Sequence, residues 1–510
     1  MAPQNNLPIN ADRHSGKTGL DDFAVACGDH FLHSISGLIA TAGVVSPDLR
    51  KLTSTANGGN GGRPPVVKTI ADARADSLRD KSGMLTLRSY RGSWWKYNGA
   101  VYRELPQSDV ESQIMGWLRE YQPDYATPNM LRSILANLAA SDLCGVSSTA
   151  CPPCWIDERA CEQLLLTSNA IIRIDRLIDA LAGKLMDHHD IFSKPSPLLF
   201  ATSGLPYAYD PFAACPRWEA YVKSALPCPE DQCMLQALFG LALVHDTRFN
   251  VFFLLWGTGG NGKSVAVETL RHLVGADNCC AVPLSQIGER FALYPLTLKS
   301  LNLVGDQSES TSPMAEALLK DITGGGSLKV ERKGIDVETR PATARCIFTG
   351  NHFPRFSDTS TGLWDRMRVI YFSQCFRDTT AEIPFLESKI IDHELPGVLN
   401  WALRGLVWLR SLPRFPESPD AVAVKAEKRN HADSARAFLV EMAEAAPDNT
   451  IPTAVLYNHY MDYCFSHGLK SQSMAELAAR VQSLYTGVRK QRVRDDSGSQ
   501  VFSWLGLRLK

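Results

Sequence analysis

The sequence has little excess charge and no long apolar segment. Lysine and arginine total 53 against 54 aspartates and glutamates, which gives a formal net charge of −1. A nearly neutral chain excludes nucleic-acid binding through overall charge, so any such contact must come from local basic patches. No apolar run reaches membrane-spanning length and no secretory signal is evident. We therefore expect no membrane contact and a cytoplasmic location.

The 13 cysteines follow no regular disulfide or zinc-finger spacing. Cys144, Cys151, Cys154 and Cys161 cluster, and the central pair has the C-x₂-C spacing of half a zinc site. No second C-x₂-C pair follows. We favour free thiols in a reducing compartment, with zinc binding as the open alternative.

The chain of 510 residues is too long for one hydrophobic core. We predict a poorly ordered segment and linker over residues 1–80, and an α+β, mostly helical N-terminal domain over 81–225. A core domain over 226–412 and a C-terminal domain over 413–510 follow. Asn98-Gly99 predicts a hairpin within 94–102, helices are expected over 110–121 and 128–140, and residues 162–250 are expected to be mostly helical. The aromatic residues at 94–102 favour core packing, with nucleobase stacking as the alternative.

One stretch of the core domain carries a complete phosphate-loop pattern, G-x-x-x-x-G-K-[ST]. The expected strand 251–256 leads into it and the expected helix 265–274 follows. Its members are Gly257, Thr258, Gly259, Gly260, Asn261, Gly262, Lys263 and Ser264. Glycines let backbone N–H groups surround phosphates, the lysine adds positive charge, and the serine hydroxyl can bind Mg²⁺. The pattern predicts a site for ATP and Mg²⁺.

Three later segments supply candidate partners for this loop. A strand over 301–306 ends at Asp306, which can hold the Mg²⁺ shell, and Glu309 could share that work. A strand over 344–351 ends at Asn351, whose amide can orient the attacking water. Arg366 and Arg368 precede a further apolar strand.

The order of these motifs resembles the superfamily III helicases, in the branch of phage and plasmid primase-helicases that includes the poxvirus primase-helicase. The segments that carry the resemblance are GTGGNGKS at 257–264, LVGDQSES at 303–310, LLKDITGGGSLKVERK at 318–333, FTGNHFPRF at 348–356 and DTSTGLWDRMRVIYF at 358–372. The resemblance covers roughly residues 85–505 and is strongest over 200–375. It implies an α/β fold with an AAA+-like phosphate-loop ATPase core.

The resemblance also implies roles for individual residues. Lys263 and Ser264 bind ATP and Mg²⁺, Asp306 is the acid beside the metal, Asn351 is the sensor, and Arg366 is the arginine finger, with Arg368 as the alternative. The implied DNA-contacting residues are Lys320, Lys329, Arg332 and Lys333. Gly326 departs from the family, which usually has aspartate there. No primase active site is evident, so primase activity is not expected.

The C-terminal domain combines expected helices over 435–445, 453–465 and 474–485 with a basic hairpin. Its basic residues are Arg489, Lys490, Arg492 and Arg494, and a strand over 500–507 follows. This order predicts a winged helix that binds DNA, with a solvated basic hairpin as the alternative.

Together these features predict an ATP-dependent DNA helicase or translocase that acts in replication of a phage, plasmid or other mobile element. The expected partners are single-stranded and forked DNA, further copies of the chain in a hexameric ring, and a separate primase or initiator. The expected location is then the host cytoplasm. The alternatives are a regulatory or defence ATPase that does not unwind DNA, and a non-catalytic origin-binding protein.

Overall fold

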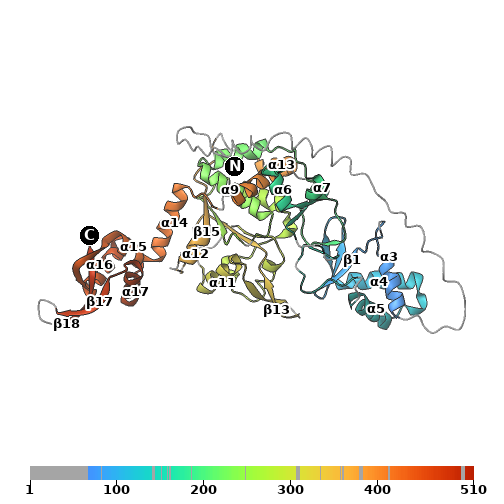
Figure 1. Ribbon diagram of the computed structural model, residues 1–510, viewed down its shortest axis with the longest axis horizontal. Coiled ribbons are helices and arrows are strands. Elements are labelled where there is room, and N and C mark those ends of the chain that lie inside the picture. Colours follow the sequence, from blue (N-terminus) through green and yellow to red (C-terminus); the bar gives the residue numbers. More distant parts are fainter. Residues whose placement is uncertain are drawn as a thin grey trace, which may run out of the picture.

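The computed structural model describes residues 67–510, except 82, 141–143, 151, 158, 160–161, 185–186, 247, 306–310, 333–334, 357, 359–360, 378, 380–382, 412–413 and 495–499. The chain forms an N-terminal unit, a central unit built on a parallel sheet, and a C-terminal unit (Figure 1). Helix α14 leads from the central unit to the C-terminal one. Within the described ranges, no helix has both the length and the apolar character needed to cross a bilayer.

The N-terminal unit packs three helices beside a three-stranded antiparallel sheet. Its elements are α3 (Val67–Ser77), β1 (Leu87–Tyr90), β2 (Ser93–Tyr97), β3 (Tyr102–Leu105), α4 (Gln107–Tyr121) and α5 (Pro128–Ala140). The hairpin at Asn98-Gly99 is confirmed: Asn98 Oδ1 accepts the backbone N–H groups of Ala100 and Val101, both at 3.0 Å. Trp94 and Tyr102 are buried, as core packing predicts. Most of the segment 1–80 lies outside the described residues, but its end forms α3.

The expectation of mostly helix over 162–250 is wrong for its first part. Short strands occur at β4 (Cys154–Trp155), β5 (Leu164–Leu166), β6 (Ile171–Arg173), β7 (Phe192–Ser193) and β8 (Leu199–Phe200), with α6 (Ile174–Leu181) and α7 (His188–Ile191) between them. Strands this short bury apolar side chains through pairing with distant segments, which local periodicity does not reveal. The expected helices before the phosphate loop are present as α8 (Pro216–Ala225) and α9 (Pro229–Ala242).

The central unit contains a five-stranded parallel sheet in the order β10-β11-β14-β9-β15. Its strands are β9 (Phe252–Trp256), β10 (Cys279–Cys280), β11 (Leu301–Val304), β14 (Arg345–Gly350) and β15 (Met367–Tyr371). Parallel pairing places all five carboxyl ends at one edge of the sheet, here the carboxyl edge, and all amino ends at the opposite, amino edge. Strand β9, which precedes the phosphate loop, lies between β14 and β15.

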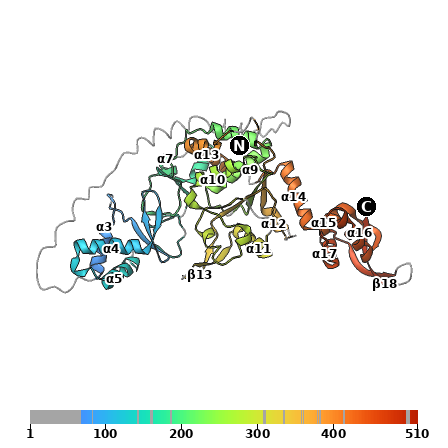
Figure 2. The same cartoon turned by 180° about the vertical axis from the view of Figure 1, so that it is seen from behind.

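Helices cover both faces of this sheet, and the side chains of β9 alternate between them. Phe253 and Leu255 join the core formed with α8, α9, α10 (Lys263–Val274) and α13 (Leu386–Ser411). Phe252 and Leu254 join the core formed with α11 (Pro313–Thr323) and α12 (Thr361–Arg366). The view from behind shows α9, α10 and α13 on one side of the sheet and α11 and α12 on the other (Figure 2). A strand that is apolar on both faces is therefore buried on both.

A two-stranded hairpin and three short 3₁₀ turns complete the described part of the central unit. The hairpin pairs β12 (Ser327–Arg332) with β13 (Ile335–Pro341). The three turns are Ala276–Asn278, Leu284–Gln286 and Pro295–Thr297, and a further turn, Pro123–Tyr125, joins α4 to α5 in the N-terminal unit. The hairpin leaves the C-terminal end of α11 and returns to the start of β14, so it is attached at the amino edge of the sheet.

The C-terminal unit has its own core and an antiparallel sheet in the order β16-β18-β17. After the connecting helix α14 (Pro419–Ala432), its elements are α15 (Ser434–Met442), β16 (Ala443–Pro452), α16 (Thr453–Ser466), α17 (Met474–Leu484), β17 (Arg489–Arg494) and β18 (Gln500–Leu509). The helix expected over 435–445 ends at Met442. The next ten residues form β16, which sequence reasoning missed because Pro, Asp and Asn within it disfavour a strand. Pairing with β18 outweighs that preference.

Candidate phosphate-binding site

The loop between β9 and α10 has the backbone that its glycines predict. Gly259, Gly260 and Gly262 have φ angles of +100°, +64° and +84°, in the left-handed region that favours glycine. A Cβ at Gly257 would lie 2.1 Å from Asn261 Nδ2 and 2.4 Å from the Phe372 carbonyl oxygen. Any side chain there would displace both groups, so the loop conformation requires glycine at this position.

Lys263 is the first residue of α10 and is only 8% exposed. Its ammonium donates to the Gly257 carbonyl at 2.7 Å, to Asn261 Oδ1 at 3.0 Å and to Asn351 Oδ1 at 3.2 Å. Asn351 directly follows β14, and Gly350 pairs in register with Trp256 of β9. The structure therefore brings together two residues 88 positions apart that the sequence proposed as partners.

The remaining predicted members of this edge divide into two groups. Thr258 and Ser264 are exposed, and Ser264 lies in the first turn of α10. Strand β11 points its carboxyl end toward the same edge and ends at Val304. Asp306 and Glu309 lie outside the described residues.

Four residues that sequence reasoning missed contact the loop. Tyr221 of α8 donates its hydroxyl to the Gly262 carbonyl at 2.9 Å. The Phe372 carbonyl accepts Asn261 Nδ2 at 3.0 Å, and the Phe376 and Arg377 N–H groups donate to the Gly260 carbonyl at 2.7 and 3.3 Å. Residues 372–377, here the covering segment, follow β15, which pairs with β9. The sequence predicted an apolar strand at this point but not its place beside β9, and only that pairing brings its carboxyl end to the loop.

Arg366 lies at the opposite, amino edge of the sheet. It ends α12 and is half-buried, and its guanidinium donates to the Lys320 carbonyl and, at 3.1 Å, to Thr323 Oγ1 at the end of α11. Arg368 is more enclosed. It lies over the Phe415 ring at 5.1 Å and 3.7 Å from Glu417, and burial lowers the pKa of its guanidinium. Of the two arginines, Arg366 has the less enclosed guanidinium environment.

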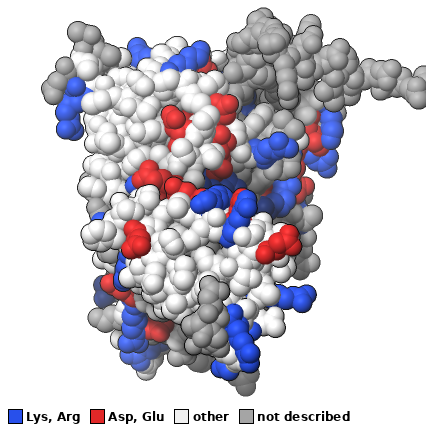
Figure 3. All heavy atoms as spheres, turned by 90° about the vertical axis from the view of Figure 1, so that its left-hand side faces the viewer, with Lys and Arg blue, Asp and Glu red and all other residues white. Residues whose placement is uncertain are grey.

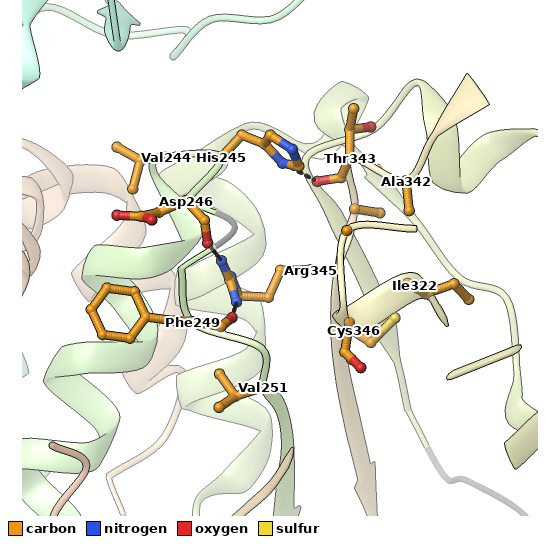
Figure 4. Close-up of a pocket in the computed structure, with 13 residues that line it drawn as sticks. Val244, His245, Asp246, Phe249, Val251, Ile322, Ala342, Thr343, Arg345 and Cys346 are labelled. Carbon is orange, nitrogen blue, oxygen red and sulfur yellow. Dashed lines mark hydrogen bonds between the residues drawn. The ribbon is translucent and has the colours of Figure 1, made fainter. Parts of the chain in front are cut away.

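A pocket at this amino edge contains the start of β14 (Figure 4). Its Arg345 donates to the Phe249 carbonyl at 3.2 Å and to the Asp246 carbonyl at 2.9 Å, and burial lowers its pKa to about 10. Thr323, which accepts the hydrogen bond from Arg366, also lines the pocket. The pocket is thus separate from the phosphate loop, which lies at the other edge.

The predicted DNA-contacting residues of the central unit occupy different environments. Lys320 forms an ion pair with Asp358 at 2.8 Å and is 34% exposed. On β12, Lys329 is exposed while Leu328 and Val330 are buried in the core. This alternation is that of a strand with one buried face and one exposed face. The Arg332 side chain and Lys333 lie outside the described residues. Gly326 packs tightly, since a Cβ there would lie 3.0 Å from the Asp321 carbonyl.

All four predicted basic residues of the C-terminal hairpin, Arg489, Lys490, Arg492 and Arg494, are exposed on β17. Lys490 Nζ lies 5.4 Å from the centre of the Phe502 ring and the Arg492 guanidinium lies 4.9 Å from it. On the face shown in Figure 3, Lys and Arg side chains are interspersed with Asp and Glu rather than forming one continuous patch. The basic residues at this end of the molecule therefore form a small group on β17 and not a surface-wide positive patch.

The predicted cysteine cluster is only partly described. Cys144 is buried and Cys154 lies in β4, while Cys151 and Cys161 lie outside the described residues. No group of three or more potential metal ligands occurs among the residues that the structure describes.

Comparison with known proteins gives a partial match to one family. A family model described as a family of unknown function, DUF5906, matches residues 255–366. DNA-binding protein RFX2 of Rattus norvegicus and that of Mus musculus are each 30% identical to this chain over 73 residues, which is 14% of this chain. The chain spans about a tenth of the length of these curated relatives.

Solved structures give broader coverage at low identity. The apo A form of the NrS-1 C-terminal region aligns with a TM-score of 0.50 and 10% identity, over 88% of this chain and 100% of that one. Another apo structure of this region (305-718) aligns with a TM-score of 0.48 and 11% identity, over 87% and 100% of the two chains. At this identity the first likeness shows a shared mixed α/β fold with a parallel sheet and helices.

Proposed function

We propose that this chain is a ring-forming, ATP-dependent DNA helicase or translocase that acts in replication of a phage, plasmid or other mobile element. The meeting of Lys263 and Asn351 is the observation that carries the proposal. A buried lysine on a glycine-rich loop supplies charge to phosphates, and a neutral amide beside it can orient water without adding negative charge. These two groups lie beyond the carboxyl ends of the adjacent parallel strands β9 and β14, an arrangement that suits an ATP-hydrolysing site.

The donor set of the loop fits a triphosphate with Mg²⁺. Backbone N–H groups at the start of α10 and the ammonium of Lys263 suit phosphate oxygens. The exposed Ser264 hydroxyl, in the first turn of α10, and the carboxylate of Asp306 would hold Mg²⁺, which prefers oxygen ligands. When bound, Mg²⁺ neutralises charge on the phosphates.

The position of Arg366 supports hydrolysis at subunit interfaces. Strand β15 pairs with β9 from Met367 opposite Phe252 to Tyr371 opposite Trp256. Arg366 precedes the first pair and the phosphate loop follows the last, so about 16 Å of strand separates them. Arg366 therefore cannot reach the loop of its own chain, whereas an arginine from a neighbour can supply charge to the leaving phosphate. In a ring, this arrangement couples ATP turnover to subunit contacts.

Two basic hairpins support contact with DNA. Lys329 projects from β12, and four cations project from β17. The C-terminal unit runs helix, strand, two helices and a two-stranded hairpin, which is the order of a winged helix. The matched curated relative is named a DNA-binding protein, and the NrS-1 region shares the fold. These features support DNA as the polymer on which the ring acts.

The central test is ATP hydrolysis by the purified chain with and without single-stranded DNA, combined with a mass measurement of the assembly. We expect hydrolysis that DNA stimulates and an assembly of several subunits. A monomer that does not hydrolyse ATP under any condition would overturn the proposal. Strand displacement on forked DNA then separates a helicase from a regulatory or defence ATPase, and activity of any kind argues against a non-catalytic origin-binding protein.

A further inference from the structure

The covering segment is attached to the phosphate loop at several points. The Phe372 N–H donates to the Trp256 carbonyl at 2.8 Å, and the Phe372 carbonyl accepts from Asn261. Four residues later, two successive N–H groups donate to the Gly260 carbonyl. Asn261 also accepts a hydrogen bond from Lys263. The segment is thus connected to the phosphate-binding lysine through a single amide.

This attachment places the Arg377 side chain against the loop. A Cβ at Gly260 would lie 2.9 Å from Arg377 Cβ and 3.4 Å from its Nε. Gly260 therefore leaves the space through which the guanidinium passes alongside the loop. The φ of +64° at Gly260 also disfavours any other residue. Glycine at position 260 therefore satisfies two separate requirements, the backbone conformation and the close contact with Arg377.

The Arg377 guanidinium is exposed beside the loop. Within the described part of the chain, no hydrogen bond or ion pair engages its guanidinium. By contrast, the exposed Arg271 and Arg404 lie near the carboxylates of Glu268 and Glu219. Guanidinium groups bind phosphates through paired N–H donors, so an uncommitted one at a phosphate loop has a natural ligand.

We propose that Arg377 binds phosphate oxygens of the nucleotide held by the loop of its own subunit. This inference rests on the proposed function and deepens it. The site then receives positive charge from two directions, from Lys263 inside the loop and from Arg377 outside it. Arg366 supplies a third charge from the neighbouring subunit. Arg377 thus acts in cis and Arg366 in trans.

The test measures binding of a non-hydrolysable nucleoside triphosphate, together with ATP turnover, in an Arg377→Ala variant. We expect affinity to fall about tenfold to a hundredfold, the usual effect of removing a charged hydrogen-bond donor. Arg377→Lys should retain part of the affinity, because charge remains while the paired donors are lost. Gln374→Ala, on the same covering segment, is the matched control and should bind like the wild type. Wild-type affinity in Arg377→Ala would overturn the inference.

Mixing variants distinguishes cis from trans action. At an ATP concentration too low to occupy the Arg377→Ala site, Arg377→Ala and Lys263→Ala each lack a working loop side, so exchanging mixtures of the two should recover no activity. Recovery in that mixture would place Arg377 at the site of a neighbour and overturn action in cis. The proposed function fails separately: if Lys263→Ala keeps wild-type hydrolysis, the loop is not the ATP site. If Lys263→Ala is inactive and Arg377→Ala is unaffected, only the inference about Arg377 fails.

Discussion

The two edges of the parallel sheet bear charged groups of different kinds. At the carboxyl edge, the buried ammonium of Lys263 donates to two side-chain amides and a backbone carbonyl. At the amino edge, the guanidinium groups of Arg345 and Arg366 donate to backbone carbonyls of their own chain. This comparison is the basis for our proposal that the carboxyl edge binds a phosphate ligand within the subunit, while Arg366 at the amino edge acts on a neighbouring subunit.

The largest expected effect lies at the carboxyl edge. We expect Lys263→Ala to abolish ATP turnover and to leave the protein folded, because the lysine supplies charge to phosphates. Steady-state hydrolysis and circular dichroism measure the two properties. Near wild-type hydrolysis in a folded variant would remove the functional distinction between the edges.

The second effect tests the amino edge. We expect Arg366→Ala to lower turnover by roughly 10³-fold, the usual effect of losing an arginine finger. If it acts on a neighbour, exchanging mixtures of Arg366→Ala and Lys263→Ala subunits should partly recover activity, since some interfaces contain one intact loop and one intact arginine. Arg368→Ala is the matched comparison and should act mainly on stability because Arg368 is enclosed. No recovery in exchanging mixtures, with both arginine variants alike, would contradict the ring.

The third effect concerns stability rather than turnover. Asp246 is buried and accepts from Arg248 at 2.9 and 2.6 Å, with Arg410 at 3.5 Å. Asp246→Ala removes this carboxylate from Arg248 and Arg410, although Arg410 keeps its ion pair with Asp175, and we expect the free energy of unfolding to fall by on the order of 2 kcal/mol. Turnover per folded molecule should not change. Denaturant unfolding and an active-site titration measure the two.

The difference in the free energy of unfolding between Asp246→Ala and the wild type should also depend on pH. Burial alone raises the pKa of Asp246, but hydrogen bonds and charge from Arg248, with charge from Arg410, lower it below its ordinary value of 3.8. The stabilisation is therefore present above pH 3.8 and is lost as pH falls through the folded-state pKa. The free energies of unfolding of the variant and the wild type, measured at pH 7 and at pH 3, should differ less at pH 3. A difference that widens instead would show that Asp246 is not held as a carboxylate.

The smallest effect concerns the two hairpins. We expect Lys329→Ala to weaken binding of single-stranded DNA by a few-fold. The slope of the logarithm of the binding constant against the logarithm of the salt concentration should fall in magnitude by about one, since one fewer counterion is released. Basal hydrolysis without DNA should persist. Arg492→Ala on β17 should instead weaken duplex binding, because a wing meets duplex phosphates. Unchanged salt slopes in both variants would place these hairpins on solvated surfaces that do not bind DNA.

Sequence reasoning succeeded where local structure depends on neighbouring residues. The phosphate-loop pattern requires glycines and a lysine at fixed spacing, because the loop closes over only eight residues. Strands that are apolar on both faces, such as β9 and β14, were predictable since burial on two sides leaves a continuous apolar run. The predicted helices α5, α10 and α16 were found for a similar reason, because their apolar residues recur at helical spacing.

Tertiary structure alone decided what depends on pairing between distant segments. Strand β16 and the short strands from β4 to β8 form because partners elsewhere in the chain satisfy their backbone groups. The order β10-β11-β14-β9-β15 places Asn351 at Lys263, directs Arg377 to Gly260 and puts Arg366 at the far edge. Nothing in the spacing of these residues encodes that order. Sequence therefore determined the candidate loop, whereas the sheet determined which other residues meet it, because strand order follows from burial across the whole core.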